Sequence, residues 1–251
     1  MRIFIFFILL IFPIILNAQE AERELLQYEF TSLLIDLSNS GTIGYKAQLF
    51  ENNYFIGFDF SQGMLMRTGR QFDFSIIGNG FFKLNLIDAR IAYSRAGEFT
   101  IDMETNELKT IDGHSLYDRI IIPPGFIEIY INNNILYAIY PNGEILNCGE
   151  IYSYELDTEE LYTDTVPHRT FEQMLSDISD LIDRTDGMLL GIRNNGRNDR
   201  AIFFYRGENE SISDSIIVNT FLEYSNVDFF NSYIRLFEIM NILNTTAHNK
   251  R

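Results

Sequence analysis

The chain has 251 residues, with 19 Lys and Arg against 35 Asp and Glu, which gives a formal net charge of −16. This acidic balance argues against nucleic-acid binding, because that affinity depends on clustered Lys and Arg side chains that neutralise phosphates. Cys148 is the one cysteine and the three histidines are far apart in sequence, so we expect no disulfide framework, no metal site and no other cofactor.

The N-terminus has the pattern of a secretory signal peptide. Arg2 precedes an apolar run from Ile3 to Leu16, which as a helix would span about 21 Å, less than the roughly 30 Å of a bilayer's hydrocarbon core. We place cleavage after Ala18, which makes residues 1–18 the signal segment. An uncleaved anchor is the alternative, and the chain would then contact a membrane through this segment alone.

A helix is predicted in the first part of the next segment, residues 19–57. Its apolar residues recur at spacings of four, three and four, which is the seam of a helix that packs on another helix: Leu26, Phe30, Leu33 and Leu37. Gly41 follows in an Asn-Ser-Gly sequence, and we expect it to end the helix in the left-handed conformation.

Residues 58–156 are predicted to form a compact antiparallel β-domain. Apolar and polar residues alternate along short segments, and turns rich in Gly, Asn and Pro separate these segments. The predicted strands are Gln71–Ile76, Phe81–Leu86, Glu98–Asp102, Glu107–Thr110, Ile127–Ile131, Ile135–Tyr140 and Glu144–Tyr154.

Two further segments follow this domain. Residues 157–215 contain an amphipathic helix predicted over 170–184 and a strand predicted over Ala201–Tyr205. Residues 216–251 end in a helix that we expect Ser225 to cap. Its predicted seam, at spacings of four, three, four and three, is Phe229, Tyr233, Leu236, Met240 and Leu243.

The fold class expected from these elements is mainly β with α. A compact antiparallel β-domain is flanked by N- and C-terminal helices, which pack together or with neighbouring subunits. The two seams lie near opposite ends of the chain, so either arrangement would bury them.

Four blocks of residues resemble signatures of the bacterial flagellar rod and hook proteins, and they occur in the same order. Residues 37–46 read Leu-Ser-Asn-Ser-Gly-Thr-Ile-Gly-Tyr-Lys, and residues 62–82 include Asp-Phe-Ser-Ile-Ile-Gly-Asn-Gly-Phe-Phe. Residues 93–116 begin Tyr-Ser-Arg-Ala-Gly-Glu-Phe, and residues 222–228 read Leu-Glu-Tyr-Ser-Asn-Val-Asp. The resemblance is nearest to the distal and proximal rod proteins, and it leaves residues 167–200 unmatched.

This resemblance implies a structural, non-enzymatic component of the flagellar basal body, located in the periplasm. Members of the family stack into an axial tube, so the implied partners are copies of this chain and other rod and hook proteins, with no small-molecule substrate. The assembly residues that it indicates are Asn39, Thr42, Gly44, Tyr45, Leu222, Glu223, Ser225, Asn226, Val227 and Asp228, together with the seam Phe229, Tyr233, Leu236, Met240 and Leu243.

Two other functions are compatible with the sequence. Axial flagellar proteins usually lack a cleavable signal, which favours as the alternative a periplasmic accessory or binding protein that keeps the β-domain but does not polymerise. A secreted β-rich hydrolase would require a polar cleft with converging titratable groups. We interpret Cys148 as a small buried apolar residue, His114 as a surface turn residue, and residues 102–107 as a hairpin turn rather than a calcium loop.

Overall fold

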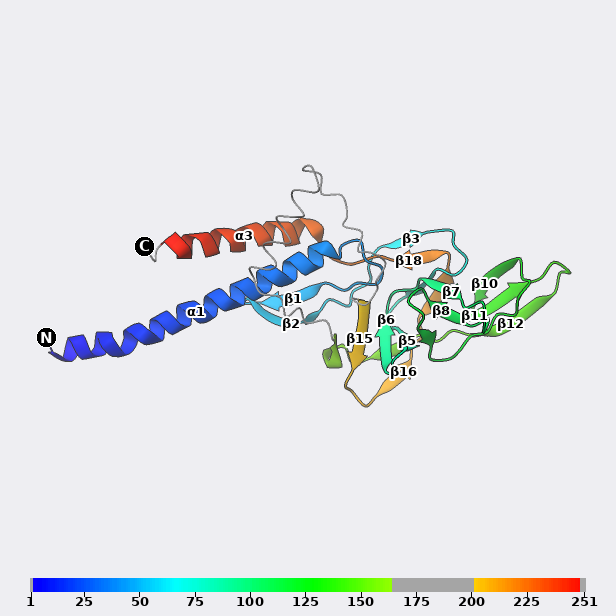
Figure 1. The fold of residues 1–251 in the computed structure, drawn as a ribbon, viewed down its shortest axis with the longest axis horizontal. Coiled ribbons are helices and arrows are strands. Elements are labelled where there is room, and N and C mark those ends of the chain that lie inside the picture. Colours follow the sequence, from blue (N-terminus) through cyan, green and yellow to red (C-terminus); the bar gives the residue numbers. More distant parts are fainter. Residues whose placement is uncertain (1, 164–200, 249–251) are drawn as a thin grey trace.

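The computed structural model describes residues 2–163 and 201–248. Within these residues, a pair of helices extends from one end of a β-domain, and the described ends of both helices lie far from that domain (Figure 1). The fold class is therefore the expected one, mainly β with α. The helix predicted over 170–184 lies outside the described residues.

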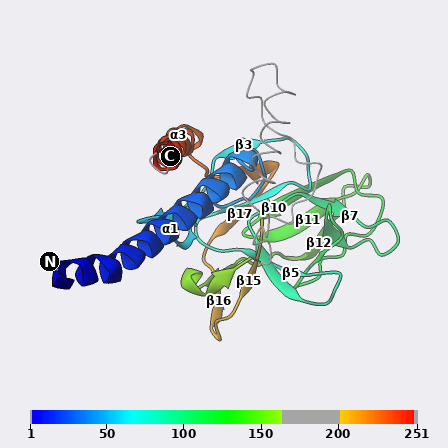
Figure 2. The ribbon, with the colours of Figure 1, turned by 60° about the vertical axis from the view of Figure 1, so that its left-hand side comes forward.

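Helices α1 (Arg2–Ser38) and α3 (Phe229–His248) lie side by side (Figures 1 and 2). α1 continues without interruption across the predicted cleavage site at Ala18. No helix among the described residues is both long enough and apolar enough to cross a membrane. The two helices share a buried apolar cluster of Leu26, Phe30 and Leu33 from α1 with Leu236, Ile239 and Leu243 from α3.

The end of α1 differs from the sequence prediction. Gly41 does not adopt a positive φ, whereas Gly44 does, with a φ of +70°. The last carbonyls of the helix are instead bound by side chains, since Ser38 Oγ and Asn39 Nδ2 both donate to the Ile35 oxygen, at 2.8 and 2.7 Å. Because these carbonyls already have partners, the helix needs no left-handed residue at its end.

A β-hairpin that the sequence analysis missed follows this helix. Strands β1 (Gln48–Glu51) and β2 (Tyr54–Phe58) pair antiparallel around Asn52 and Asn53, which have φ values of 50° and 68°. Two consecutive residues with positive φ produce the twist of a tight hairpin turn, and asparagine tolerates that conformation better than most residues. Asn53 also accepts a hydrogen bond from Arg235 of α3, at 2.9 Å.

The largest sheet among the described residues has seven strands and is built from both halves of the chain. Its order is β14 (Leu161–Tyr162), β15 (Ile202–Tyr205), β6 (Ile91–Ser94), β5 (Phe82–Asn85), β9 (Ser115–Leu116), β8 (Leu108–Thr110) and β7 (Phe99–Ile101). The strand predicted over Ala201–Tyr205 is thus confirmed, and it pairs with β6 across more than 100 residues of sequence.

Smaller ladders complete the β-domain within the described ranges. A three-stranded sheet at the end away from the helices consists of β10 (Glu128–Asn132), β11 (Ile135–Ile139) and β12 (Ile145–Glu150) (Figure 1). The remaining ladders are β4 (Phe74–Ile77) with β17 (Ile216–Asn219), β3 (Leu65–Arg67) with β18 (Phe221–Glu223), and β13 (Tyr154–Leu156) with β16 (Glu210–Ile212), and the 3-10 turn η1 (Thr158–Glu160) follows β13. Pairing with β15 to β18 extends the β-structure beyond residue 156.

The predicted strand Glu144–Tyr154 is wrong in extent, because it forms two strands. β12 ends at Glu150, after a bulge at which Leu136 pairs with Gly149 and Tyr137 with Asn147. β13 then pairs with β16, a different partner. The chain changes partners between the two strands, and a continuous alternation of residue types cannot reveal such a change.

Aromatic side chains connect the helix pair to the β-domain. Tyr28 of α1 contacts Phe50 of the hairpin with ring centroids 5.9 Å apart, and Phe55 and Phe58 continue the series at 5.8 and 5.3 Å. Phe58 then contacts Phe203 of β15 at 5.3 Å. Aromatic contacts of this kind add to the apolar area that each ring buries, so they link the hairpin to α1 at one end of the series and to β15 at the other.

Candidate assembly site

The first and fourth sequence blocks meet in the folded chain. Ile43 forms an antiparallel bridge with Tyr224, and the Gly44 amide donates to the Glu223 carbonyl oxygen at 2.8 Å. Ile43 and Leu222 are buried in one apolar cluster with Ala96. Residues about 180 positions apart therefore form one structural unit at the base of the helix pair.

The carboxylate of Glu223 is the centre of this unit. One oxygen accepts from Lys46 Nζ at 2.6 Å and from the Gly63 amide at 3.0 Å, and the other accepts from Arg95 Nε at 2.8 Å. Lys46, Arg95 and Glu223 are at most 3% exposed. A buried carboxylate is stable only when its oxygens are paired in this way.

The two cations also bind backbone oxygens around the carboxylate. Arg95 donates to the carbonyl oxygens of Gly78 and Gly80 at 2.9 and 2.6 Å, and Lys46 donates to that of Ser61 at 2.6 Å. Burial lowers the pKa of the Lys46 ammonium, and the Glu223 carboxylate opposes this change. The arrangement holds five segments of chain in one fixed geometry.

Asn226 and Gly44 complete the unit, which we call the terminal clasp: Gly44, Lys46, Arg95, Glu223 and Asn226. Asn226 accepts from the Ala47 amide at 2.8 Å and donates to the Asp59 carbonyl at 2.6 Å, so its side chain bridges two backbone segments. Gly44 has a φ of +70°, and a Cβ atom there would overlap the backbone of Ala96. Glycine is required at this point because both the conformation and the close approach exclude a side chain.

Asn39, Thr42 and Tyr45 lie beside the terminal clasp and connect it to α1. Asn39 is fully buried, and its Oδ1 accepts from Thr42 Oγ1 at 3.1 Å. The Tyr45 hydroxyl donates to the carboxylate of Asp36 on α1 at 2.8 Å. These predicted residues therefore make contacts within the chain that orient α1.

The start of α3 corrects one prediction. Asp228, and not Ser225, caps the helix, because its Oδ1 accepts from the Asn231 amide at 3.0 Å. Ser225 Oγ accepts from the Val227 amide at 3.1 Å in the turn before the helix. Asp228 lies immediately before the first helical residue, which is the position where a side-chain oxygen reaches a free amide.

The predicted seam of α3 is also wrong in part. Leu236 and Leu243 are buried against α1, but the third seam residue is Ile239, and Met240 is 38% exposed. Phe229 and Tyr233 are likewise exposed. Position 239 falls between 236 and 243 at spacings of three and four, so it continues the buried face, whereas Met240 lies on the next face.

The exposed apolar side chains of α3 form a second surface, which we call the outer stripe: Phe229, Phe230, Tyr233, Ile234, Phe237 and Met240. Phe229 and Tyr233 stack with ring centroids 6.4 Å apart, and Tyr233 contacts Phe237 at 5.2 Å. A continuous series of exposed aromatic residues on one helix is typical of a protein interaction surface.

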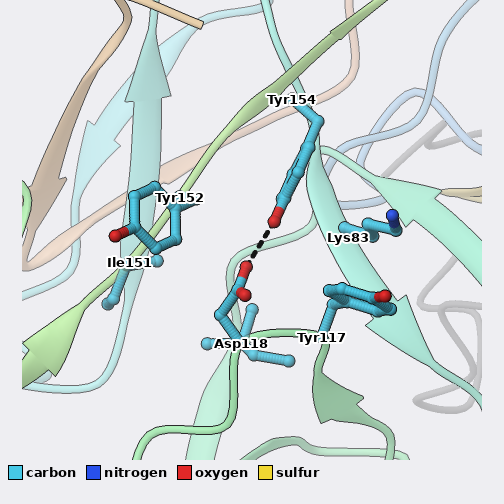
Figure 3. A pocket seen from close by; sticks show the side chains of 7 residues that line it. Lys83, Tyr117, Asp118, Ile151, Tyr152 and Tyr154 are labelled. Atoms are coloured by element: carbon cyan, nitrogen blue, oxygen red, sulfur yellow. Dashed lines mark hydrogen bonds between the residues drawn. The ribbon is translucent and has the colours of Figure 1, made fainter. Parts of the chain in front are cut away.

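Titratable groups also gather around Lys83, in the β-domain, and a hydrolase would need a cluster of this kind. Lys83 lies over the Tyr117 ring, with its ammonium 3.9 Å from the ring centroid, and it pairs with Glu210. Figure 3 shows the Tyr154 hydroxyl bonded to Asp118 beside this lysine. Burial, assisted by the bound carboxylate, raises the pKa of Tyr154, so the phenol remains a hydrogen-bond donor. These side chains fill the depression that they line and leave no space for a substrate.

A larger depression, of about 320 Å³, is lined mainly by apolar side chains that include Phe72, Met103 and Phe126. In the described part of the chain, no group of three or more His, Cys, Asp and Glu side chains could hold a metal ion. Cys148 is half-buried, and burial raises the pKa of its thiol. The described residues therefore present packed contacts and apolar surfaces where a hydrolase would present a polar cleft.

The sequence analysis did not single out three residues of the site. Lys46 and Arg95 lie inside the quoted blocks, and their charges in otherwise apolar or small-residue surroundings were the available signal. Asp36 lies on the predicted helix between seam positions Leu33 and Leu37, and its burial follows from packing of the hairpin against α1. No local pattern indicates that a charged residue on a helix will be covered by a later segment.

In a comparison with protein families, residues 75–134 match the family described as the flagellar hook protein FlgE/F/G D1 domain. In the structure this range runs from β4 to the turn after β10.

Comparison with curated proteins gives similar sequences in flagellar basal-body rod proteins. The chain is 35% identical over 85 residues to FlgG of Buchnera aphidicola subsp. Schizaphis graminum, an alignment that covers 34% of this chain and 32% of the relative. It is 39% identical over 71 residues to FlgG of Agrobacterium fabrum and 40% identical over 76 residues to FlgG of Borreliella burgdorferi, covering 28% and 30% of this chain and 27% of each relative. The chain thus spans about a third or less of the length of the relatives that it matches.

Proposed function

We propose that the protein belongs to the bacterial flagellar rod and hook family and is a structural component of the flagellar basal body. The match over residues 75–134 and the similarity to FlgG proteins support this proposal. The protein acts by assembly and not by catalysis. Its partners are copies of itself and other rod and hook proteins, and it reaches the periplasm through the signal segment.

The observation that carries this proposal is the joint that the terminal clasp forms between the segment after α1 and the segment before α3. The terminal clasp fixes the helix pair to the β-domain through buried, fully bonded groups, and α3 directs an apolar stripe outward. A subunit that transmits force needs a rigid joint within the chain and a repeated contact between chains. The clasp supplies the first, and the outer stripe supplies the second.

This division assigns different roles to the predicted assembly residues. Asn39, Thr42, Gly44, Tyr45, Leu222, Glu223 and Asn226 set the direction of the helix pair, and Asp228 starts α3. Phe229, Tyr233 and Met240 contact neighbouring subunits, together with Phe230, Ile234 and Phe237. Leu236 and Leu243 hold α3 on α1.

The helix pair makes contacts outside the signal segment. Among the residues whose side chains the structure describes, the shared apolar cluster begins at Leu26 of α1. Arg235 of α3 also pairs with Glu29 of α1 at 2.7 Å. Cleavage after Ala18 would therefore leave this apolar cluster and the Glu29–Arg235 ion pair intact.

A pair of matched double variants tests the proposal. Tyr233→Ser with Met240→Ser changes two residues of the outer stripe that lie seven positions apart. The control, Asn231→Ser with Glu238→Ser, has the same spacing on the polar side of the same helix. The control removes two exposed contacts, that of Asn231 with Asp228 and that of Glu238 with Arg235, and both variants keep the buried cluster. Both should therefore fold, with a stability within about 1 kcal/mol of the wild type.

We expect the wild-type chain and the control to co-purify with hook–basal bodies, and the outer-stripe variant to be lost from them. Equal recovery of both variants would contradict the role of the stripe. A wild-type chain found only as a freely soluble species would overturn assembly altogether and would favour the accessory protein that does not polymerise.

A further inference from the structure

Asp36 is a buried carboxyl group at the junction between α1 and the β-domain. It is 2% exposed and lies less than one turn before the end of the helix. Its Oδ1 accepts from the Tyr45 hydroxyl at 2.8 Å, and its Oδ2 accepts from the Gln48 amide at 3.1 Å. Both donors belong to the segment that leads from the helix into the hairpin.

Residues of this segment contact two different parts of the chain. Tyr45 and Gln48 bind Asp36 on α1, whereas Lys46 between them binds Glu223 in the terminal clasp. The segment is thus fixed on one side to the helix and on the other to the body. Breaking the contacts of Asp36 would release the helix from this segment while leaving the clasp in place.

We propose that Asp36 is a proton-dependent lock, which holds the α1–α3 pair in its docked orientation on the β-domain when protonated and loosens it when ionised. The proposal concerns the single chain and does not depend on whether that chain assembles.

The first support is the cost of burying an ionised carboxylate. Burial is the main cause that raises the pKa of Asp36 to about 6, and hydrogen bonds from Tyr45 and Gln48 oppose this rise. In the protonated state the Tyr45 oxygen, 2.8 Å away, can accept the new hydrogen bond because a phenol both donates and accepts. Protonation thus reverses the direction of the Tyr45 hydrogen bond, and burial shifts the balance towards the neutral form relative to a solvated carboxyl.

The second support is the state of the surrounding charges. On α1 these are Glu29 and, about three turns or more before Asp36, Glu20, Glu22, Arg23 and Glu24. The others are Arg235 and Glu238 of α3, Lys46, and Glu51 at the turn end of β1. Arg235 pairs with Glu29 and Glu238, Lys46 pairs with Glu223, and no neighbouring charge contributes to the pKa shift of Asp36. Tyr45 is the titratable group in direct contact. Burial and neutral hydrogen-bond donors therefore govern the protonation of Asp36.

The direction of the pH effect follows from the two states. When the helix pair is undocked, Asp36 is solvated and has its ordinary pKa of 3.8; when docked, its pKa is about 6. The docked state is thus favoured fully below about pH 4, and this advantage is lost as the pH rises through 6. The ratio of docked to undocked chain should fall on the order of a hundredfold between these limits.

The test uses the full chain and two measurements. The Asp36 carboxyl carbon is titrated by NMR, and amide hydrogen exchange is followed for residues 30–39 and 45–48 at pH 4.5 and 7.5, corrected for the intrinsic pH dependence of exchange. We expect a midpoint near pH 6 and protection roughly twentyfold higher at pH 4.5.

Variants separate the lock from general effects of acid. Asp36→Asn should abolish the pH dependence of protection, and Asp88→Asn, which removes an exposed carboxylate paired with Arg90, should keep it. Tyr45→Phe should move the midpoint upward, because it removes a hydrogen bond that favours the ionised form.

A midpoint near pH 4 in the wild-type chain would overturn the proposal, and so would an unchanged pH dependence in Asp36→Asn. Should Asp36→Asn fail to fold, the wild-type midpoint and its direction of change in Tyr45→Phe decide the question.

Discussion

The terminal clasp and the outer stripe differ in almost every physical property, although the sequence analysis assigned some residues of each to one role, assembly. The clasp is charged, buried and bonded within the chain, whereas the stripe is largely aromatic and is exposed among the residues that the structure describes. The comparison teaches that one sequence signature can contain two kinds of residue. Residues of the clasp set the orientation of the helix pair, and residues of the stripe lie on the exposed face of α3.

Removing the centre of the clasp should have the largest effect. Glu223→Ala leaves the buried cations Lys46 and Arg95 without their carboxylate, which should lower the free energy of unfolding by about 3–5 kcal/mol. Urea unfolding of both chains measures this change. As a control, Asp88→Ala removes one partner of an exposed pair and should leave the urea midpoint unchanged. A Glu223→Ala chain as stable as the wild type would mean that the clasp does not fix the joint.

Truncation on the two faces of α3 sharpens the same comparison. Leu236→Ala creates a cavity between the helices and should cost about 2–5 kcal/mol of unfolding free energy. Phe230→Ala removes a side chain that is 70% exposed and should change it by less than about 0.5 kcal/mol. Thermal unfolding of the two variants gives both values. Equal losses would show that the outer stripe is covered within the single chain.

Two nearby glycines provide a third comparison. Gly44→Ala should cost about 1–3 kcal/mol, because the residue has a positive φ and its new Cβ would overlap the Ala96 backbone. Gly41→Ala meets open space and should be neutral or slightly stabilising. Denaturant midpoints of the two variants decide this, and a costly Gly41→Ala would restore that residue as the helix-ending glycine.

The smallest expected effect concerns the cap of α3. Asp228→Ala should cost about 1 kcal/mol, because the Asn231 amide loses its acceptor. Ser225→Ala removes a single hydrogen bond in an irregular turn and should cost only about a few tenths of a kcal/mol. Helix content by circular dichroism, followed with thermal unfolding, measures both. A larger loss in Ser225→Ala would support the cap expected from the sequence.

Much of the fold could be predicted because its signals are local. The alternation in Phe99–Ile101 and Leu108–Thr110, with the turn between them, predicted the pairing of β7 and β8 that the structure contains. The seam of α1 was likewise predicted, since Leu26, Phe30 and Leu33 are all buried. The hairpin of β1 and β2 was missed, although Asn52 and Asn53 between two apolar segments offered a signal.

The candidate site was less predictable than the fold. The blocks that contain Gly44 and Glu223 were identified, but not that Lys46 and Arg95 would meet between them. Such contacts depend on which distant strands pair. β3 pairs with β18, and in that ladder Glu223 lies opposite Leu65, a residue far from it in sequence.

The sequence by itself determined many of the strands, the presence of the two helices and the order of the blocks, because the spacing of apolar residues and the turn residues act within a few positions of each other. The tertiary structure alone decided which face of α3 is buried. Leu236, Ile239 and Leu243 form one apolar face, and Phe229, Tyr233 and Met240 form another beside it. Both faces satisfy the helical period, and only the position of α1, fixed by the clasp and by Arg235, selects between them.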